Sequence, residues 1–179
     1  FLYSPVRIIK PEAILETGTH KGISASYFGL ALKENKKGEL VTIEFDSQHW
    51  EGAEKLWEIL DITKYILLKK HKVEDLIVSR QYDILFLDTE PDQRFAELVR
   101  FFPNVKPGGY ILIHDLHRGM CQGNINPDLP DFPSWPFGNL PKEIKDWVKD
   151  GQLRPFHFGT PRGLTCFYKT DARDYRWDK

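Results

Sequence analysis

The chain has 179 residues, of which 41% are hydrophobic and 28% charged, and its formal net charge at pH 7 is −1. This length and apolar content predict a single domain, residues 1–179, with a buried core. The nearly balanced charge does not indicate a nucleic-acid partner. No apolar run reaches the roughly 18 residues of a membrane span, and the residues given show no signal-peptide pattern, so we expect a cytoplasmic protein without a membrane partner.

The chain begins with Phe1 rather than Met, so we expect residues to be missing before it. Its two cysteines, Cys121 and Cys166, predict reduced thiols and not a disulfide framework or a metal cluster.

Strand and helix patterns alternate strictly along the first two thirds of the chain. A helix is expected to end before Pro11, because proline disfavours helical backbone at the residue before it. The predicted strands are 13–16, 40–46, 65–69, 82–88 and 110–114, and the last follows a predicted turn at 107–109. The predicted helices are 23–34, 50–60 and 93–102, with a short loop and helix at 73–78. Such alternation predicts a doubly wound parallel sheet with right-handed crossovers.

The pattern changes after Asp115. Residues 116–140 are rich in Pro, Gly and Asn and show no periodicity, which predicts a long functional loop that contacts a substrate. Its aromatic residues either form a wall over a bound substrate or pack on the sheet edge; they are Phe132, Trp135 and Phe137. A helix at 141–149 and two short strands at 155–158 and 164–169 follow, and the brief connection between these strands requires them to be antiparallel.

The most informative stretch is the turn between the first strand and the first long helix. It has the pattern E-x-G-x-x-x-G, from Glu16 through Gly18 to Gly22. Glycines let the backbone bend sharply there, and the N–H groups that begin the next helix favour an anionic or polar ligand. The turn therefore predicts a nucleotide-type cofactor site. A dinucleotide fingerprint would need glycine where the chain has His20 and Ile23, and this argues against a nicotinamide cofactor.

Acidic residues end the second predicted strand, about twenty residues after the glycines. An acid at this position accepts the hydroxyls of an adenosine ribose. Two residues are candidates, Glu44 and Asp46, and Asp46 also fits the N-cap of the helix that begins near His49. We therefore expect Glu44 to bind the ribose and Asp46 to cap the helix.

These motifs resemble those of class I S-adenosylmethionine-dependent methyltransferases. Over nearly its whole length the chain is similar to the small-molecule O-methyltransferase branch, which includes catechol and macrocin-type sugar O-methyltransferases. The resemblance implies a Rossmann-like α/β sheet of order 3-2-1-4-5-7-6 with an antiparallel C-terminal hairpin. It also implies methyl transfer to a hydroxyl of a small molecule, of sugar or natural-product type.

The resemblance also assigns a cofactor site. Glu44 would hold the ribose, Val73 and Glu74 would lie beside the adenine, and Asp75 would either touch the adenine or cap a helix. The residues that would surround the methionine half are Glu16, Gly18, Thr19, His20 and Gly22. Asp88, at the end of the fourth strand, would contribute to this site as well.

Two carboxylates, Asp88 and Asp115, end the fourth and fifth predicted strands. Neighbouring strands lie about 4.8 Å apart, so we expect the two carboxylates to be close and either to share a proton or to hold a cation. In the metal-dependent relatives an equivalent pair, followed by Asn, binds a divalent ion such as Mg²⁺. Here Leu116 follows Asp115, and His117 is either a replacement ligand or a general base.

Two further positions bear on the chemistry. Pro91 stands where catechol-type enzymes carry a catalytic lysine, and His114 is expected to face the core. A non-catalytic S-adenosylmethionine-binding module would explain Pro91 and Leu116, and an NAD-dependent oxidoreductase is the other alternative. The fourth strand does not end in the Asn/Asp-Pro-Pro-Tyr/Phe-type motif of enzymes that methylate nitrogen in nucleic acid or protein. A homodimer is compatible with the sequence.

Overall fold

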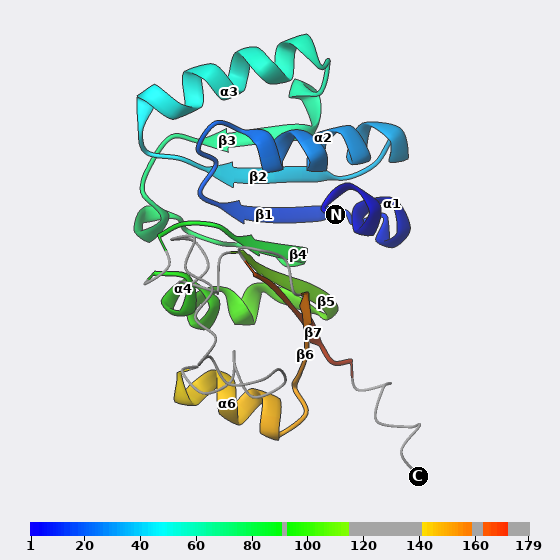
Figure 1. Cartoon of the computed structure of the whole chain (residues 1–179), viewed down its shortest axis with the longest axis vertical. Coiled ribbons are helices and arrows are strands. Elements are labelled where there is room, and N and C mark those ends of the chain that lie inside the picture. The colour runs from blue at the N-terminus through cyan, green and yellow to red at the C-terminus, as the bar shows by residue number, and fades with distance from the viewer. Residues whose placement is uncertain (91–92, 115–140, 159–162, 172–179) are drawn as a thin grey trace, which may run out of the picture. The chain divides into compact units, whose positions relative to one another are not determined.

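The computed structural model describes residues 1–90, 93–114, 141–158 and 163–171 (Figure 1). Its seven strands form one sheet of order β3-β2-β1-β4-β5-β7-β6, which confirms the expected order. The chain divides into two compact units, Phe1–Phe86 and Leu87–Lys179. Among the residues described, no helix combines the length and apolar character needed to cross a membrane.

The first unit contains the glycine turn. β2 lies between β1 and β3 and pairs with both in parallel register. All five residues of β1 are buried, as expected of a strand covered on both faces. The elements in chain order are α1 (Tyr3–Ile9), β1 (Ala13–Thr17), α2 (Ile23–Asn35), β2 (Glu39–Ile43), α3 (Ser47–Ile59), β3 (Ile66–Lys69) and β4 (Tyr82–Leu87).

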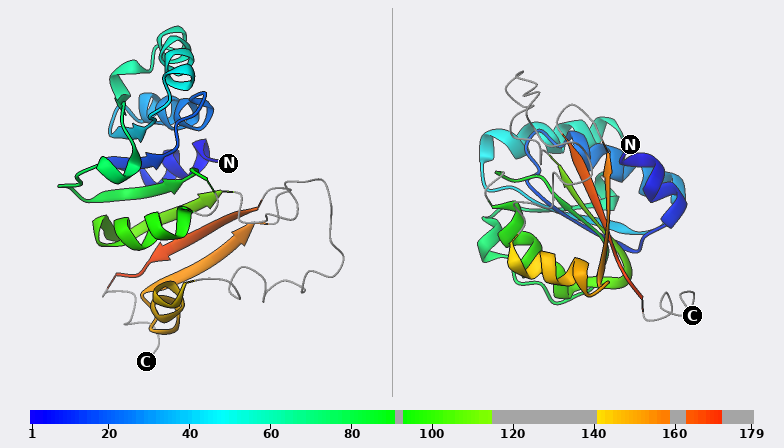
Figure 2. Two further views of the ribbon diagram at one scale, coloured as in Figure 1. Left: turned by 90° about the vertical axis from the view of Figure 1, so that its left-hand side faces the viewer. Right: turned by 60° about the horizontal axis from the view of Figure 1, so that its bottom comes forward.

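The second unit contains the C-terminal hairpin. β7 pairs antiparallel with both β5 and β6, as predicted from the short connection between the last two strands (Figure 2). The elements of this unit are α4 (Arg94–Phe101), β5 (Val105–His114), α6 (Lys142–Lys149), β6 (Leu153–Phe158) and β7 (Leu164–Lys169).

Several predicted boundaries need correction. β2 ends at Ile43, three residues before the predicted end, so Glu44 lies just after the strand. Residues 107–109, predicted as a turn, are part of β5, and Gly108 adopts a left-handed φ of 82° within the strand. Asp75 does not cap a helix: it is the last residue of the 3-10 turn Val73–Asp75, and the N-cap position belongs to Lys72.

Cys166 lies in β7 and is buried, and burial raises its thiol pKa to about 12. The thiolate is the reactive form, so at pH 8 the folded protein should present about a thousandfold less thiolate than an exposed cysteine would. In a Cys121→Ser variant, we expect a thiol-alkylating reagent at pH 8 to modify Cys166 at least a hundredfold more slowly in the folded chain than in urea. Similar rates in the two states would contradict this description of β7.

Candidate functional site

The turn after β1 depends on left-handed backbone. Gly18, His20 and Gly22 have φ values of 84°, 47° and 72°. The N–H groups of Gly18 and Thr19 both donate to the carbonyl of Ile43, at 3.2 and 3.1 Å. These bonds fasten the turn to the end of β2, so the glycine motif and the acidic segment that follows β2 are held together.

Gly22 has a packing role as well as a conformational one. The indole Nε1 of Trp57 donates to the Gly22 carbonyl at 3.2 Å. A Cβ built on Gly22 would lie 2.6 Å from the Cβ of Ala53, and both contacts come from α3. Glycine is therefore required at this position because α3 packs closely against the turn.

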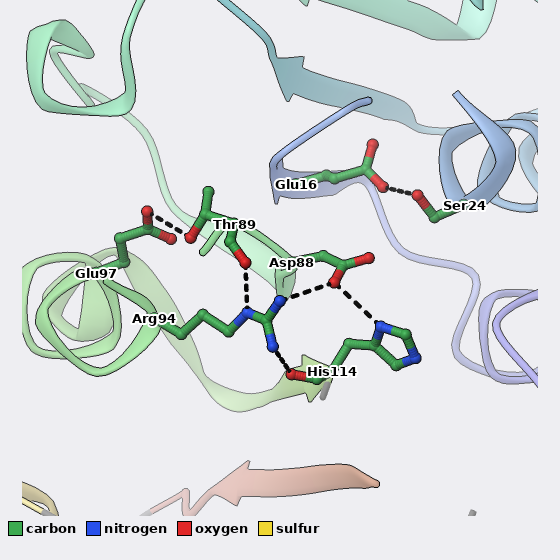
Figure 3. A network of polar contacts seen from close by, with 7 residues as sticks. All are labelled: Glu16, Ser24, Asp88, Thr89, Arg94, Glu97 and His114. Carbon is green, nitrogen blue, oxygen red and sulfur yellow. Dashed lines mark hydrogen bonds and ion pairs between the residues drawn. The ribbon is translucent and has the colours of Figure 1, made fainter. Parts of the chain in front are cut away.

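Glu16 is fully buried below the turn. Its carboxylate accepts a short hydrogen bond from the Ser24 hydroxyl (Figure 3) and another from Thr42 Oγ1 at 2.6 Å. Thr42 Oγ1 in turn lies 2.5 Å from Thr19 Oγ1. Hydroxyls from α2 and β2 thus fix the orientation of a buried acidic group at the carboxyl end of β1.

Glu44 is 7% exposed, and its carboxylate is fixed by main-chain donors. Oε2 accepts from the His20 N–H at 2.8 Å, and Oε1 accepts from the N–H groups of Phe45 and Asp46 at 3.0 and 2.9 Å. Asp46 accepts from the Gln48 N–H at 2.9 Å, which confirms that it caps α3. Asp46 therefore caps the helix as predicted, and the ribose contact of Glu44 stays a prediction.

A separate polar network lies in the second unit, around Arg94 (Figure 3). Arg94 is 3% exposed, and its Nε donates to the Thr89 carbonyl at 2.7 Å. Nη1 donates to the His114 carbonyl, and Nη2 lies 3.4 Å from Asp88 Oδ1. The Thr89 hydroxyl donates to Glu97 at 2.8 Å. One buried guanidinium thus connects the residues that follow β4 with the last residue of β5.

His114 is not a core residue, so that expectation is wrong. Its side chain is 31% exposed, and Nδ1 lies 3.0 Å from Asp88 Oδ1. The last position of β5 directs the ring toward the carboxylate that follows β4. Asp88 therefore contacts both an imidazole and a guanidinium.

Arg94 was not among the residues predicted from the sequence, although the sequence contains a signal for it. The buried positions of α4 are spaced as one helix face, and they are Arg94, Glu97, Leu98 and Phe101. Two charged residues on a face that otherwise packs in the core indicate a buried polar network, because buried charges need partners.

The remaining predicted residues are only partly described. Val73 and Glu74 belong to the 3-10 turn Val73–Asp75. Asp115, His117 and the 116–140 loop, with its aromatic residues, lie outside the described residues, as does Pro91. Within the described ranges no three His, Cys, Asp or Glu side chains form a group that could hold a metal ion. The metal site at Asp88 and Asp115 thus stays a prediction.

Comparison with known proteins gives consistent results. A family model described as a methyltransferase domain matches residues 15–116. A provisionally assigned O-methyltransferase of Mycobacteroides abscessus is 26% identical over 129 residues, which are 70% of this chain and 59% of that protein. A catechol O-methyltransferase of Niastella koreensis is 24% identical over 121 residues, 64% of this chain and 53% of the relative. The chain thus spans just over half the length of these two curated relatives.

Solved structures share the fold. The methyltransferase PaMTH1 of Podospora anserina, bound to S-adenosylhomocysteine (SAH), has a TM-score of 0.74 at 19% identity, covering 95% of this chain and 76% of that one. An O-methyltransferase from Bacillus cereus in complex with SAH has a TM-score of 0.70 at 18% identity, covering 94% and 79%.

Proposed function

The chain belongs to the methyltransferase-domain family, and we propose that it is an S-adenosylmethionine-dependent O-methyltransferase whose acceptor is a small hydroxylated molecule of sugar or natural-product type. The observation that carries this proposal is the glycine turn after β1, bonded through the His20 N–H to the buried carboxylate of Glu44. The O-methyltransferase relatives and the SAH-bound structures of the same fold support it.

Polar groups of the first unit suit S-adenosylmethionine, with buried carboxylates at Glu16 and Glu44 beside the glycine turn. Glu44 accepts a ribose hydroxyl, because its carboxylate is already oriented at the end of β2. Glu16 and the turn residues Gly18, Thr19, His20 and Gly22 would surround the methionine half of the cofactor. The Glu16 carboxylate would balance the positive charge of its ammonium group. Val73 and Glu74 lie beside the adenine. When bound, the cofactor supplies a methyl group that its sulfonium makes electrophilic.

The residues of the second unit prepare the acceptor. Asp88 accepts the proton of the acceptor hydroxyl or orients it, and Arg94 and His114 hold the Asp88 side chain in one position. Orientation of this kind can account for much of the barrier reduction in a group transfer, and a general base contributes about 10²–10⁴-fold. Asp115 and His117 are the other candidates for proton transfer.

A divalent ion bound at Asp88 and Asp115 is an optional part of this proposal. Asp88 would have to share its carboxylate between the ion, the Arg94 guanidinium and the His114 ring. Asp115 would have to supply a further ligand. No step described above depends on the ion.

Glu44→Ala should weaken SAH binding by about 10- to 100-fold, since a hydrogen bond to a charged group contributes about 1.5–3 kcal/mol. Isothermal titration calorimetry measures this directly. The matched control is Glu39→Ala at the start of β2, the strand that Glu44 follows, where the side chain is exposed and pairs with Arg80 at 2.8 Å. It should bind SAH as the unmodified chain does.

Thermal unfolding of both variants establishes that they are folded under the titration conditions. Equal SAH affinities for Glu44→Ala and the unmodified chain would contradict the proposed cofactor site. Binding of NAD in place of SAH would contradict the proposed function itself.

A further inference from the structure

The Glu44 carboxylate has little remaining capacity to accept hydrogen bonds. An ionised carboxylate offers about four lone-pair directions. Oε1 accepts from the N–H groups of Phe45 and Asp46, and Oε2 accepts from the N–H of His20. One direction remains, on Oε2. Glu44 can therefore accept one ribose hydroxyl, although the sequence predicted that it would accept both.

The side chain next to this remaining position is His49, in the first turn of α3. Its Nδ1 lies 4.0 Å from Oε2 of Glu44 and 3.9 Å from Oδ2 of Asp46. Both separations exceed hydrogen-bond distance, so neither carboxylate occupies Nδ1 in the part of the chain that the structure describes. The His49 side chain is 34% exposed, so a ligand can reach it.

The His49 ring is also held in place. The ring of His20 packs against it edge to face, with centroids 4.2 Å apart. The backbone of His20 is in turn bonded to Glu44 through its N–H. One residue of the glycine turn thus fixes both the carboxylate and the imidazole, and the gap between Oε2 and Nδ1 is preset before any ligand arrives.

We propose that His49 is the second ribose ligand of this site, an inference that rests on the proposed S-adenosylmethionine function. One ribose hydroxyl donates to Oε2 of Glu44, and the neighbouring hydroxyl exchanges a hydrogen bond with Nδ1 of His49. Vicinal hydroxyls suit two partners that are too far apart to bond each other. The rival partner for this hydroxyl is Asp46. Its Oδ2 lies 3.9 Å from Nδ1 of His49, and its Oδ1 accepts from the N–H of Gln48.

The test compares SAH with its 2′-deoxy and 3′-deoxy analogues, by calorimetric titration of the full chain and three variants. His49→Phe keeps an aromatic ring against His20 but removes Nδ1, and His49→Asn keeps a polar group near the position of Nδ1. Asp46→Asn tests the rival. Thermal unfolding is recorded for each variant.

We expect His49→Phe to bind SAH about 3- to 10-fold more weakly than the unmodified chain, the effect of one neutral hydrogen bond. It should bind one of the two deoxy analogues as tightly as the unmodified chain does, because that analogue lacks the hydroxyl in question. His49→Asn should recover most of the SAH affinity.

The inference is overturned if His49→Phe weakens SAH and both analogues by the same factor, or if it weakens none of them. It is also overturned if Asp46→Asn, and not His49→Phe, removes the discrimination between SAH and a deoxy analogue. Failure of the unmodified chain to bind SAH would instead refute the proposed function, so the two failures are distinguishable.

Discussion

Replacing Arg94 with alanine should lower the free energy of unfolding by about 3–5 kcal/mol, the range found when one partner of a buried ion pair is removed. The guanidinium is 3% exposed and donates to the carbonyls of Thr89 and His114 while it lies beside Asp88. Its removal leaves a partly buried carboxylate without this cation and two carbonyls without this donor. Urea unfolding followed by circular dichroism measures the change.

Two further substitutions isolate the cause. Arg94→Lys keeps the charge but not the planar fork of donors, so it should recover only part of the loss. Arg80→Ala removes an arginine that is 42% exposed and pairs with Glu39, and exposed pairs contribute about 1 kcal/mol or less. If Arg94→Ala were no more destabilising than Arg80→Ala, the network around Arg94 would not have the structural role assigned to it.

Gly22→Ala should lower the free energy of unfolding by about 2–5 kcal/mol. A left-handed backbone costs a residue with a Cβ about 1–2 kcal/mol, and overpacking a core adds about 1–3 kcal/mol. Gly22 has a φ of 72°, and its new Cβ would lie 2.6 Å from the Cβ of Ala53 and 3.0 Å from the indole of Trp57. Urea unfolding again gives the difference.

Gly52→Ala is the matched control. Gly52 lies within α3, and a Cβ there would meet nothing within 4 Å. Alanine should therefore stabilise the protein by about 0.5–1 kcal/mol, through helix propensity alone. A neutral result for Gly22→Ala would show that α3 does not pack against the turn as described.

Much of the fold could be predicted because local patterns and topology agree. Buried parallel strands have continuous apolar runs, as in β1, and short connections force antiparallel pairing, as in β6 and β7. The errors occurred where conformation depends on single residues. Gly108 continues β5 although glycine next to proline is typical of a turn, and Asp75 ends a 3-10 turn, which rules out the helix cap that was one of its two predicted roles.

The sequence predicted that the glycine turn and Glu44 belong to one site, but it did not predict how they contact each other. The spacing of Glu16, Gly18, Gly22 and Glu44 indicates a cofactor turn from sequence alone. The bond between the His20 N–H and Glu44 could not be predicted, because it requires a left-handed His20 and a specific approach of two loops. The position of His114 beside Asp88 likewise depends on where β5 ends.

The most direct test of the central claim is transfer of a labelled methyl group from S-adenosylmethionine to a panel of small hydroxylated acceptors, with release of SAH measured in parallel. We expect transfer to at least one acceptor, with loss of product in Glu44→Ala and in Asp88→Asn and full activity in Glu39→Ala. Binding of SAH without transfer to any acceptor would contradict the proposed activity and favour a non-catalytic cofactor-binding module.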